Sequence, residues 1–285
     1  MKNLLLSAFA LALLAGCSDQ DDNLNEQKNL LVNFSFDPNQ ERLDNIGQPA
    51  VIPQGNAAQT PKINGMSGHY IELAPDALTP LGEGEIIYMG TETQAGGDKA
   101  IDFRQSRIVA NNENFLEIPL NKVAPGTYKW VRISVSYQSG TIDLLHEGNR
   151  IQGTLASFLG YNTYIDNVEI NGQTVDVNAN KLQGFWVFEA LGFTVDGQAP
   201  EGAVTVPNPL FETSPIPQGS CVITGEFKEP LIITGEENEN ITINLSFSIN
   251  NSFEWTEVNA DGQYEPGAGE QLVDMGLRGL IPSHN

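Results

Sequence analysis

A short acidic stretch near the C-terminus spaces oxygen-bearing side chains at alternate positions around a glycine. Its candidate calcium ligands are Glu257, Asn259, Asp261, Gln263 (through its backbone carbonyl) and Glu265. This is the spacing of the first half of an EF-hand-type loop, in which the glycine permits the sharp turn. The first ligand is Glu rather than Asp, however, and Ala268 stands where a bidentate Glu is expected. The spacing therefore predicts a weak Ca²⁺ site, with an ordinary Asp-Gly turn as the alternative.

Two aromatic residues fall on the polar face of a predicted strand at residues 127–137. Val131, Ile133 and Val135 form one face of this strand, which places Tyr128 and Trp130 on the other. Aromatic rings offer a large apolar surface with a polar edge, and this combination suits ligand contacts as well as core packing. Tyr128 and Trp130 are therefore the candidate ligand-binding residues, and packing between sheets is the alternative for both.

Motifs of known catalytic centres are missing from the sequence. His69, His146 and His284 are far apart, and no two histidines have the spacing of zinc ligands on one helix. The sequence contains neither a nucleophile elbow nor a phosphate-binding glycine-rich loop. Cys221 has no histidine near it in the sequence, which favours a core residue over a nucleophile. We expect a protein without catalytic activity; a hydrolase with paired carboxylates is the alternative, and the 36 acidic residues offer too many pairs to choose from.

The N-terminus has the three parts of a secretory signal. Lys2 supplies the positive charge, residues 4–14 are apolar, and small residues follow. The apolar run is too short to span a bilayer core of roughly 30 Å. The tetrad Leu14-Ala15-Gly16-Cys17 resembles the signal of bacterial lipoproteins, in which the cysteine sulfur carries diacylglycerol. The resemblance implies that residues 1–16 are removed and that Cys17 is lipidated; an ordinary signal peptide is the alternative. Residues 18–28 are polar and have no apolar period, so we expect residues 17–28 to form a lipidated, flexible tether.

The residues that follow Cys17 bear on the location of the protein. Ser18 is followed by Asp19, Asp21 and Asp22. This cluster resembles the acidic export signal that sends lipoproteins of Bacteroidota to the outer face of the outer membrane. We therefore expect a lipid-anchored protein at the cell surface, and a solvated acidic tether is the alternative reading of the same residues.

Charge narrows the range of partners. The chain has 285 residues and a formal net charge of −22. Loss of residues 1–16 would remove one lysine and no acid, which leaves 13 basic and 36 acidic side chains and a charge of −23. Such a protein repels phosphate backbones, so we expect no nucleic-acid partner. It also repels anionic lipid head groups, which leaves the lipid anchor as the expected membrane contact, while Ca²⁺ or cationic partners would suit it.

Alternation of apolar and polar residues predicts many short strands. The most regular run is 241–250, where Ile, Leu and Phe alternate with Thr, Asn and Ser, and residues 30–36 alternate in the same way. Further strands are predicted at residues 68–73, 85–89, 100–103, 115–120, 127–137, 164–170, 174–177, 185–188, 221–227 and 231–234. The single candidate helix covers residues 154–159.

Turn residues indicate how these strands connect. Hairpins are expected to join residues 115–120 to 127–137, 164–170 to 174–177, and 221–227 to 231–234. Pro125-Gly126 fits a type II turn, and Asn171-Gly172 is the strongest hairpin signal. Many short strands with frequent turns favour an all-β, antiparallel β-sandwich. Residues 29–285 form either one elaborated sandwich or two, covering residues 29–145 and 146–285.

The N-terminal half also resembles a known group of secreted proteins. Asn33-Phe34-Ser35-Phe36, His69 to Leu73 and Ala124 to Tyr128 follow one another as in lipoproteins related to methanobactin periplasmic-binding proteins. That resemblance implies a link to copper, but the sequence has no clustered His or Met, so it assigns no metal ligand here. The expected function is a non-catalytic binding or accessory module that captures glycan or protein; a Ca²⁺- or copper-binding lipoprotein and a structural adhesion component are alternatives.

Overall fold

The structure, a computed structural model, describes residues 27–199 and 221–285. These residues form strands joined by turns and short 3₁₀ helices. No helix within the two described ranges is long and apolar enough to cross a membrane. The strands are β1 (Asn29–Asp37), β2 (Asn56–Gln59), β3 (Lys62–Ala74), β4 (Glu85–Met89), β5 (Glu92–Thr93), β6 (Ala100–Asp102), β7 (Glu113–Pro119), β8 (Gly126–His146), β9 (Asn149–Phe158), β10 (Asn162–Ile170), β11 (Gln173–Leu182), β12 (Phe185–Ala190), β13 (Phe193–Gln198), β14 (Cys221–Ile233), β15 (Ile241–Ser248), β16 (Phe253–Thr256), β17 (Leu272–Met275) and β18 (Leu280–His284).

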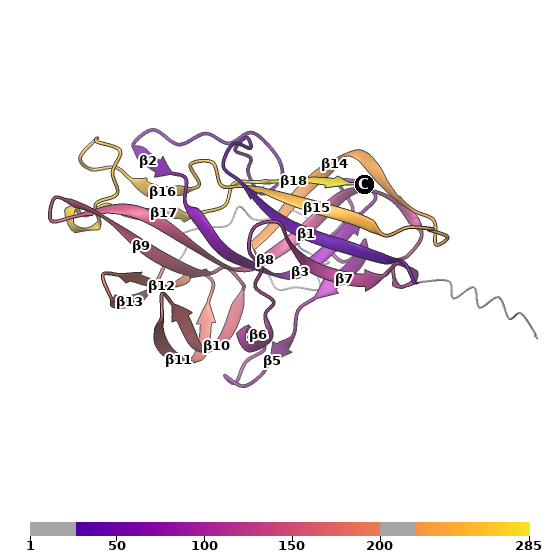
Figure 1. Cartoon of the computed structure of the whole chain (residues 1–285), viewed down its shortest axis with the longest axis horizontal. Helices are drawn as coiled ribbons and strands as arrows, with labels where there is room; N and C mark the ends of the chain where they lie inside the picture. Colours follow the sequence, from indigo (N-terminus) through magenta and orange to yellow (C-terminus); the bar gives the residue numbers. More distant parts are fainter. Residues whose placement is uncertain (1–26, 200–220) are drawn as a thin grey trace, which may run out of the picture.

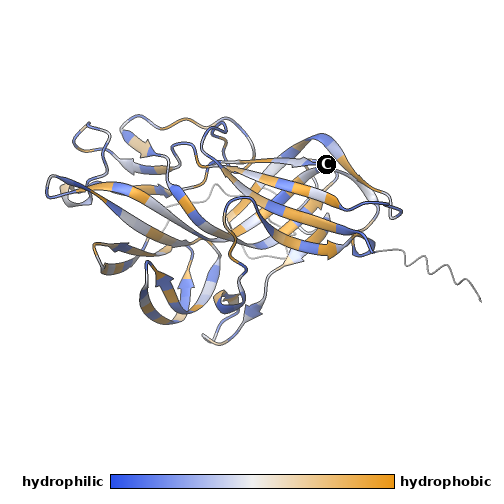
Figure 2. Cartoon of the chain, in the orientation of Figure 1, coloured by the Kyte–Doolittle hydropathy of each residue, from blue (hydrophilic) through white to orange (hydrophobic). Residues whose placement is uncertain are grey.

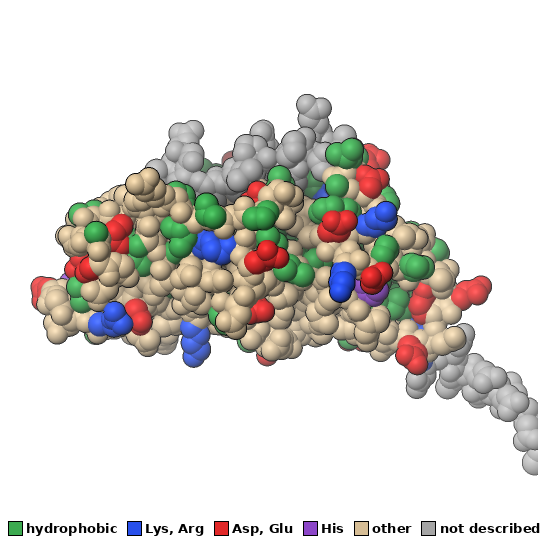
Figure 3. Space-filling model, turned by 90° about the horizontal axis from the view of Figure 1, so that it is seen from above, with side chains coloured by type: hydrophobic (Ala, Val, Ile, Leu, Met, Phe, Trp, Pro, Cys, Tyr) green, Lys and Arg blue, Asp and Glu red, His purple; other side chains and the backbone are tan. Residues whose placement is uncertain are grey.

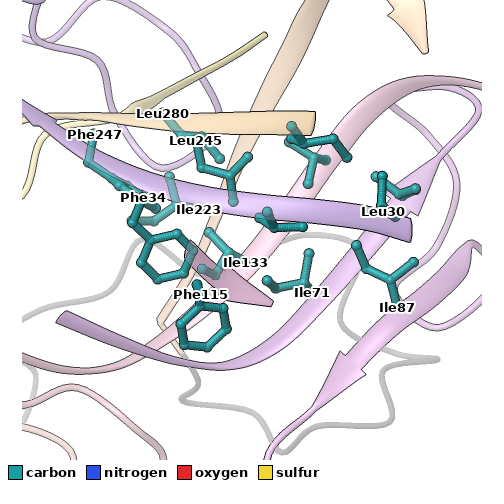
Figure 4. Packing of buried hydrophobic residues seen from close by; sticks show 14 of the residues in the cluster. Leu30, Phe34, Ile71, Ile87, Phe115, Ile133, Ile223, Leu245, Phe247 and Leu280 are labelled. Atoms are coloured by element: carbon teal, nitrogen blue, oxygen red, sulfur yellow. The ribbon is translucent and has the colours of Figure 1, made fainter. Parts of the chain in front are cut away.

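Two sheets packed face to face form one end of the molecule. A four-stranded sheet in the order β18-β15-β1-β7 lies against a seven-stranded sheet in the order β13-β12-β9-β8-β3-β4, in which β14 also pairs with β8. Apolar side chains from both sheets make the largest core (Figure 4). Phe34 of β1 stacks on Phe115 of β7, with ring centroids 4.3 Å apart. The predicted all-β sandwich is therefore confirmed.

The long strand β8 carries the larger sheet to the other end of the molecule (Figure 1). Its 21 residues span about 70 Å when extended, which is far more than the depth of one sandwich core. Two smaller sheets cover it there, one in the order β11-β10-β6-β5 and one in the order β17-β16-β2. Each covering sheet has its own apolar cluster, the first around Phe158 and Val168 and the second around Phe253 and Trp255.

Side-chain alternation explains why these strands form. In β1, buried residues alternate with partly exposed ones along the whole strand, and β15 supplies Ile243, Leu245 and Phe247 to the same core. Figure 2 shows the same alternation of apolar and polar residues along the ribbons of the sheets. Most neighbouring strands are antiparallel, but β1 pairs with β15, and β6 with β10, in parallel.

The Asn171-Gly172 hairpin prediction is confirmed. This turn joins β10 to β11, and both of its central residues have positive φ, 46° and 75°, which is the backbone of a type I′ turn. The predicted helix at residues 154–159 is wrong, because residues 154–158 belong to β9, where they pair with β8 on one side and β12 on the other.

Two other predicted hairpins are also wrong. Residues 115–120 do not pair with residues 127–137: β7 pairs with β1, and β8 pairs with β3, β9 and β14. Residues 221–227 and 231–234 are not a hairpin either, because they form the single strand β14 with an irregularity between Glu226 and Leu231. Pro125-Gly126 is not a type II turn, because Gly126 lacks the positive φ that this turn needs and is the first residue of β8. In both cases the pairing partner lies far away in the sequence.

The boundary between two possible sandwich domains, at residues 145 and 146, falls at the tip of the β8–β9 hairpin. These two strands pair from Tyr137↔Phe158 to His146↔Asn149. The largest core draws on both sides of that position, from Leu30 of β1 to Leu280 of β18. Residues on either side of the position therefore share both a sheet and a core.

Candidate functional site

An open cavity of about 780 Å³ lies at the end of the molecule where the small sheet β17-β16-β2 covers the large sheet. One wall comes from the distal half of β8 and from β9, β12 and β13, and the other from β16, β17 and the loop between them. The three segments that build it, residues 142–155, 186–199 and 253–275, are widely separated in the sequence. The cavity therefore exists only once the tertiary structure has formed.

The lining of the cavity is mostly apolar. Its aromatic members are Trp186, Phe188, Phe193, Phe253 and Tyr264. The aliphatic members are Ile142, Leu144, Ile151, Leu155, Leu191, Val195, Leu272, Val273 and Met275, and proline and alanine fill the gaps. Only four lining residues carry a polar or ionisable side-chain group apart from the aromatic residues, namely His146, Gln198, Glu270 and Gln271. Cavities of this size with a largely apolar lining are typical of sites for small apolar ligands.

Two glycines shape the aromatic wall. The ring of Phe188 lies so close over Gly153 of β9 that a Cβ atom at this position would clash with it. The ring of Trp186 lies in the same way over Gly197 of β13. Both rings can therefore lie against the sheet instead of standing upright and filling the space above it, which keeps the cavity open.

Exposed apolar side chains surround the cavity entrance. Phe193 and Leu191 are 79% and 66% exposed, and Val195 is 56% exposed. They sit on β13 and on the turn that precedes it, at the edge of the large sheet. Exposed apolar residues that continue into a cavity are a recognised mark of a binding surface.

The predicted calcium loop forms one end of this cavity. Tyr264 projects from the loop onto Phe253 and Trp255, with ring centroids 5.2 and 5.5 Å away. The buried carboxylate of Glu270 accepts backbone N–H bonds from Val258, at 3.1 Å, and from Glu265, at 2.6 Å. The loop is thus folded around an internal carboxylate and closes the core beneath β16.

The five candidate calcium ligands are engaged with one another. Asp261 Oδ1 accepts the backbone N–H of Gln263 at 2.9 Å, Glu257 Oε1 accepts that of Asp261 at 3.3 Å, and the Asn259 side chain donates to Glu265. Among the described residues, no three His, Cys, Asp or Glu side chains form a group that could hold a metal ion. Ala260 and Gly262 have positive φ, which gives the chain a sharp turn at this position.

The prediction that Tyr128 and Trp130 lie together on a polar face is wrong. Tyr128 is buried in the main core, and its hydroxyl donates to the Ala124 carbonyl at 2.7 Å. Alternation fails here because the neighbouring strand β14 is irregular between Glu226 and Leu231, the residues opposite Trp130 and Tyr128. Trp130 is half-buried and does not line the cavity; Trp186 takes that place.

The three histidines lie at separate places. His146 is at the cavity rim, and His284 bonds the Glu229 carbonyl through Nε2 at 2.9 Å. His69 is fully buried, with Nε2 3.4 Å from Glu92 Oε1. Burial lowers the pKa of His69, and the positive charge of Lys99 lowers it further, while the adjacent Glu92 carboxylate raises it.

Glu92 is the centre of a small polar cluster around His69. Lys99 Nζ lies 2.6 Å from Glu92 Oε2, and the Tyr161 hydroxyl donates to Glu92 Oε1 at 2.9 Å. The cluster links β3 of the large sheet to β5 and to the segment before β10. Because the imidazole has no exposed surface, a substrate could not reach it, and the cluster acts as a structural contact between sheets.

Cys221 packs against the main core, as expected, and is a free thiol. Burial raises the pKa of its thiol to about 12, and the negative charge of Asp274 adds to the effect. The thiol is therefore protonated at neutral pH and a poor nucleophile. Cys17, the proposed lipidation site, lies outside the described residues.

One signal in the sequence could have identified the cavity. In residues 185–190, the apolar residues occupy both faces of the strand, with Phe185 and Val187 on one and Trp186 and Phe188 on the other. A strand that is apolar on both faces needs cover on both, and incomplete cover leaves a cavity.

The chain matches no protein-family model, no curated protein and no solved structure.

Proposed function

We propose that the protein is a lipid-anchored, surface-displayed binding module without catalytic activity, and that its ligand enters the cavity between β12–β13 and β16–β17. The observation that carries the proposal is the open, apolar cavity of about 780 Å³. Ligand sites in proteins typically measure about 300–1,000 Å³ and combine an apolar lining with a few polar groups. The ligand is accordingly a largely apolar molecule or molecular segment.

The composition of the lining separates apolar ligands from glycans. A sugar presents many hydroxyl groups, each of which loses hydrogen bonds to water when it is buried without a partner. Glu270, the one buried acid in the lining, already accepts two backbone N–H bonds. The aromatic and aliphatic walls therefore support capture of an apolar ligand better than capture of a glycan.

The position of the cavity suits a tethered protein. The chain enters β1 at one end of the molecule, and the β8–β9 hairpin and the strands of the cavity lie at the opposite end (Figure 1). A lipid on Cys17 would hold the protein by the β1 end, with residues 17–28 reaching at most about 40 Å. The cavity would then face away from the membrane, where a ligand can reach it.

Binding of the neutral apolar dye Nile red tests the proposal. The protein lacking residues 1–17 should bind the dye with a rise in fluorescence, and Ala190→Trp, which fills the cavity from its wall, should weaken binding by at least about tenfold. The matched control is Leu78→Ser, because Leu78 is 80% exposed and lies outside the cavity. If the wild type does not bind the dye, or if all three proteins bind it equally, the proposal fails.

A further inference from the structure

Strand β13 is an exposed edge of the large sheet. Within the described residues it pairs with β12 alone, so the N–H and C=O groups along its other side have no strand partner. Proteins usually protect such edges with proline, lysine or bulges, since an open edge pairs readily with another chain. The edge strands β7 and β18 carry a proline, Pro119 and Pro282, whereas β13 has neither proline nor lysine, as is also true of β4 at the other end of this sheet order.

The cavity lies on one face of the large sheet, and this face extends to the open edge at β13. Phe193 and Val195 of β13 line the cavity, and they stand opposite Ala190 and Phe188 of β12, which line it too. A strand added beyond β13 would continue this face, because side chains alternate across a sheet with a period of two residues. Every second side chain of the added strand would therefore lie beside the apolar wall of the cavity.

The negative charge of the protein indicates which kind of extended chain would pair with β13. The protein carries a formal charge of −22, and Figure 3 shows acidic side chains spread along the length of the face it displays. Asp196 lies on β13 itself. A second copy of the same chain would bring two strongly negative surfaces together, whereas a basic segment would be attracted.

We propose that the ligand of this site is an extended, basic peptide segment of a partner protein, which adds as a strand to β13 and directs alternate apolar side chains into the cavity. This inference rests on the proposed function and narrows it to a class of ligand. Backbone hydrogen bonds to the edge would supply part of the affinity, and the cavity would select the side chains, as in other cases of strand addition. A lipid-like molecule would use the cavity alone, because it has no backbone to pair with β13.

Fluorescence anisotropy with a labelled heptapeptide of alternating lysine and valine tests this inference. Two twins of the peptide carry backbone N-methyl groups, one on its valines and the other on its internal lysines. Neighbouring N–H groups of a strand point to opposite edges, so only one twin loses the hydrogen bonds to β13. That twin should bind at least about tenfold more weakly, and the other should stay within about threefold of the parent peptide.

Protein variants complete the test. Phe193→Ser should weaken peptide binding, the control Leu78→Ser should not, and higher salt should weaken binding to every variant. Equal binding of both N-methyl twins and the parent peptide would overturn strand addition. If the protein binds Nile red but does not bind the peptide, this inference is overturned and the proposed function still stands. If it binds neither, both are overturned. A dimer in sedimentation that excludes the peptide would assign the edge to a second copy and would also overturn the inference.

Discussion

Glu72 and Arg132 form an ion pair in which neither side chain has any exposed surface, with Arg132 Nη1 3.5 Å from Glu72 Oε2. The two residues stand opposite each other on β3 and β8. The other carboxylate oxygen of Glu72 accepts the backbone N–H groups of Gly82 and Gly84, at 3.0 and 2.7 Å. The pair therefore holds the loop between β3 and β4 against the large sheet.

Breaking this pair should strongly destabilise the protein. Arg132→Met leaves the Glu72 carboxylate buried without its counter-ion, and loss of one partner of a buried pair costs about 3–5 kcal/mol in free energy of unfolding. Urea unfolding measures this cost. The control is Arg104→Met, which removes an exposed partner of Asp102 and should cost about 1 kcal/mol or less. The double variant Glu72→Gln/Arg132→Met should lose less than the sum of the single losses; full additivity would contradict an energetic coupling.

His69 should make the stability of the protein depend on pH. Its folded pKa lies below the ordinary value of about 6.5 because the ring is buried, so below that pH the unfolded chain binds more protons at this residue. Stability is therefore complete above about pH 6.5 and falls as the pH drops below it, by up to about 1.4 kcal/mol per pH unit. The free energy of unfolding, measured with urea between pH 5 and 7.5, should change less with pH for His69→Gln than for the wild type.

The control for this measurement is His146→Gln, which changes an exposed histidine at the cavity rim. The pH dependence of its free energy of unfolding should be closer to that of the wild type than the pH dependence of His69→Gln is. Because His69→Gln also alters the contact with Glu92, the ring of His69 in the wild type should in addition be titrated by NMR. A midpoint above 6.5 would contradict the prediction.

The loop at residues 257–265 should behave as a turn rather than as a Ca²⁺ site. Asp261→Ala removes the acceptor for the Gln263 backbone N–H and should cost about 1 kcal/mol of stability without added calcium. Millimolar Ca²⁺ should raise the melting temperature of wild type and variant equally, through screening of the acidic surface. A rise that disappears in Asp261→Ala would instead restore the calcium site that the spacing predicts.

Lipid attachment should depend on Cys17 alone. Cys17→Ala removes the sulfur that would carry diacylglycerol, so the variant should lose acylation and leave the membrane fraction or stay as an uncleaved precursor. Mass spectrometry of the N-terminus and fractionation measure both effects. Protease added to intact cells tests the surface location separately, because a protein inside the outer membrane would be protected. An unacylated variant that remains in the membrane with a processed N-terminus would contradict the anchor.

Local sequence was enough to determine many of the elements. Alternation of apolar and polar residues identified β1 and β15, because a half-buried strand must place its apolar residues on one face. Asn171-Gly172 identified the β10–β11 hairpin, since these residues adopt positive φ at little cost. The net charge and the composition are properties of the sequence itself and need no structure.

Tertiary structure alone decided which strands far apart in the sequence are neighbours. β7 pairs with β1, and β1 pairs with β15, more than 200 residues away, although the short connection of residues 120–125 joins β7 to β8. A turn limits where the chain can go, but the choice of partner depends on which apolar faces can pack together over the whole molecule. The cavity arises in the same way, because Phe193 meets Phe253 and Leu272 only after two sheets have packed. Incomplete cover of β12 is a property of that packing, which no local pattern of residues contains.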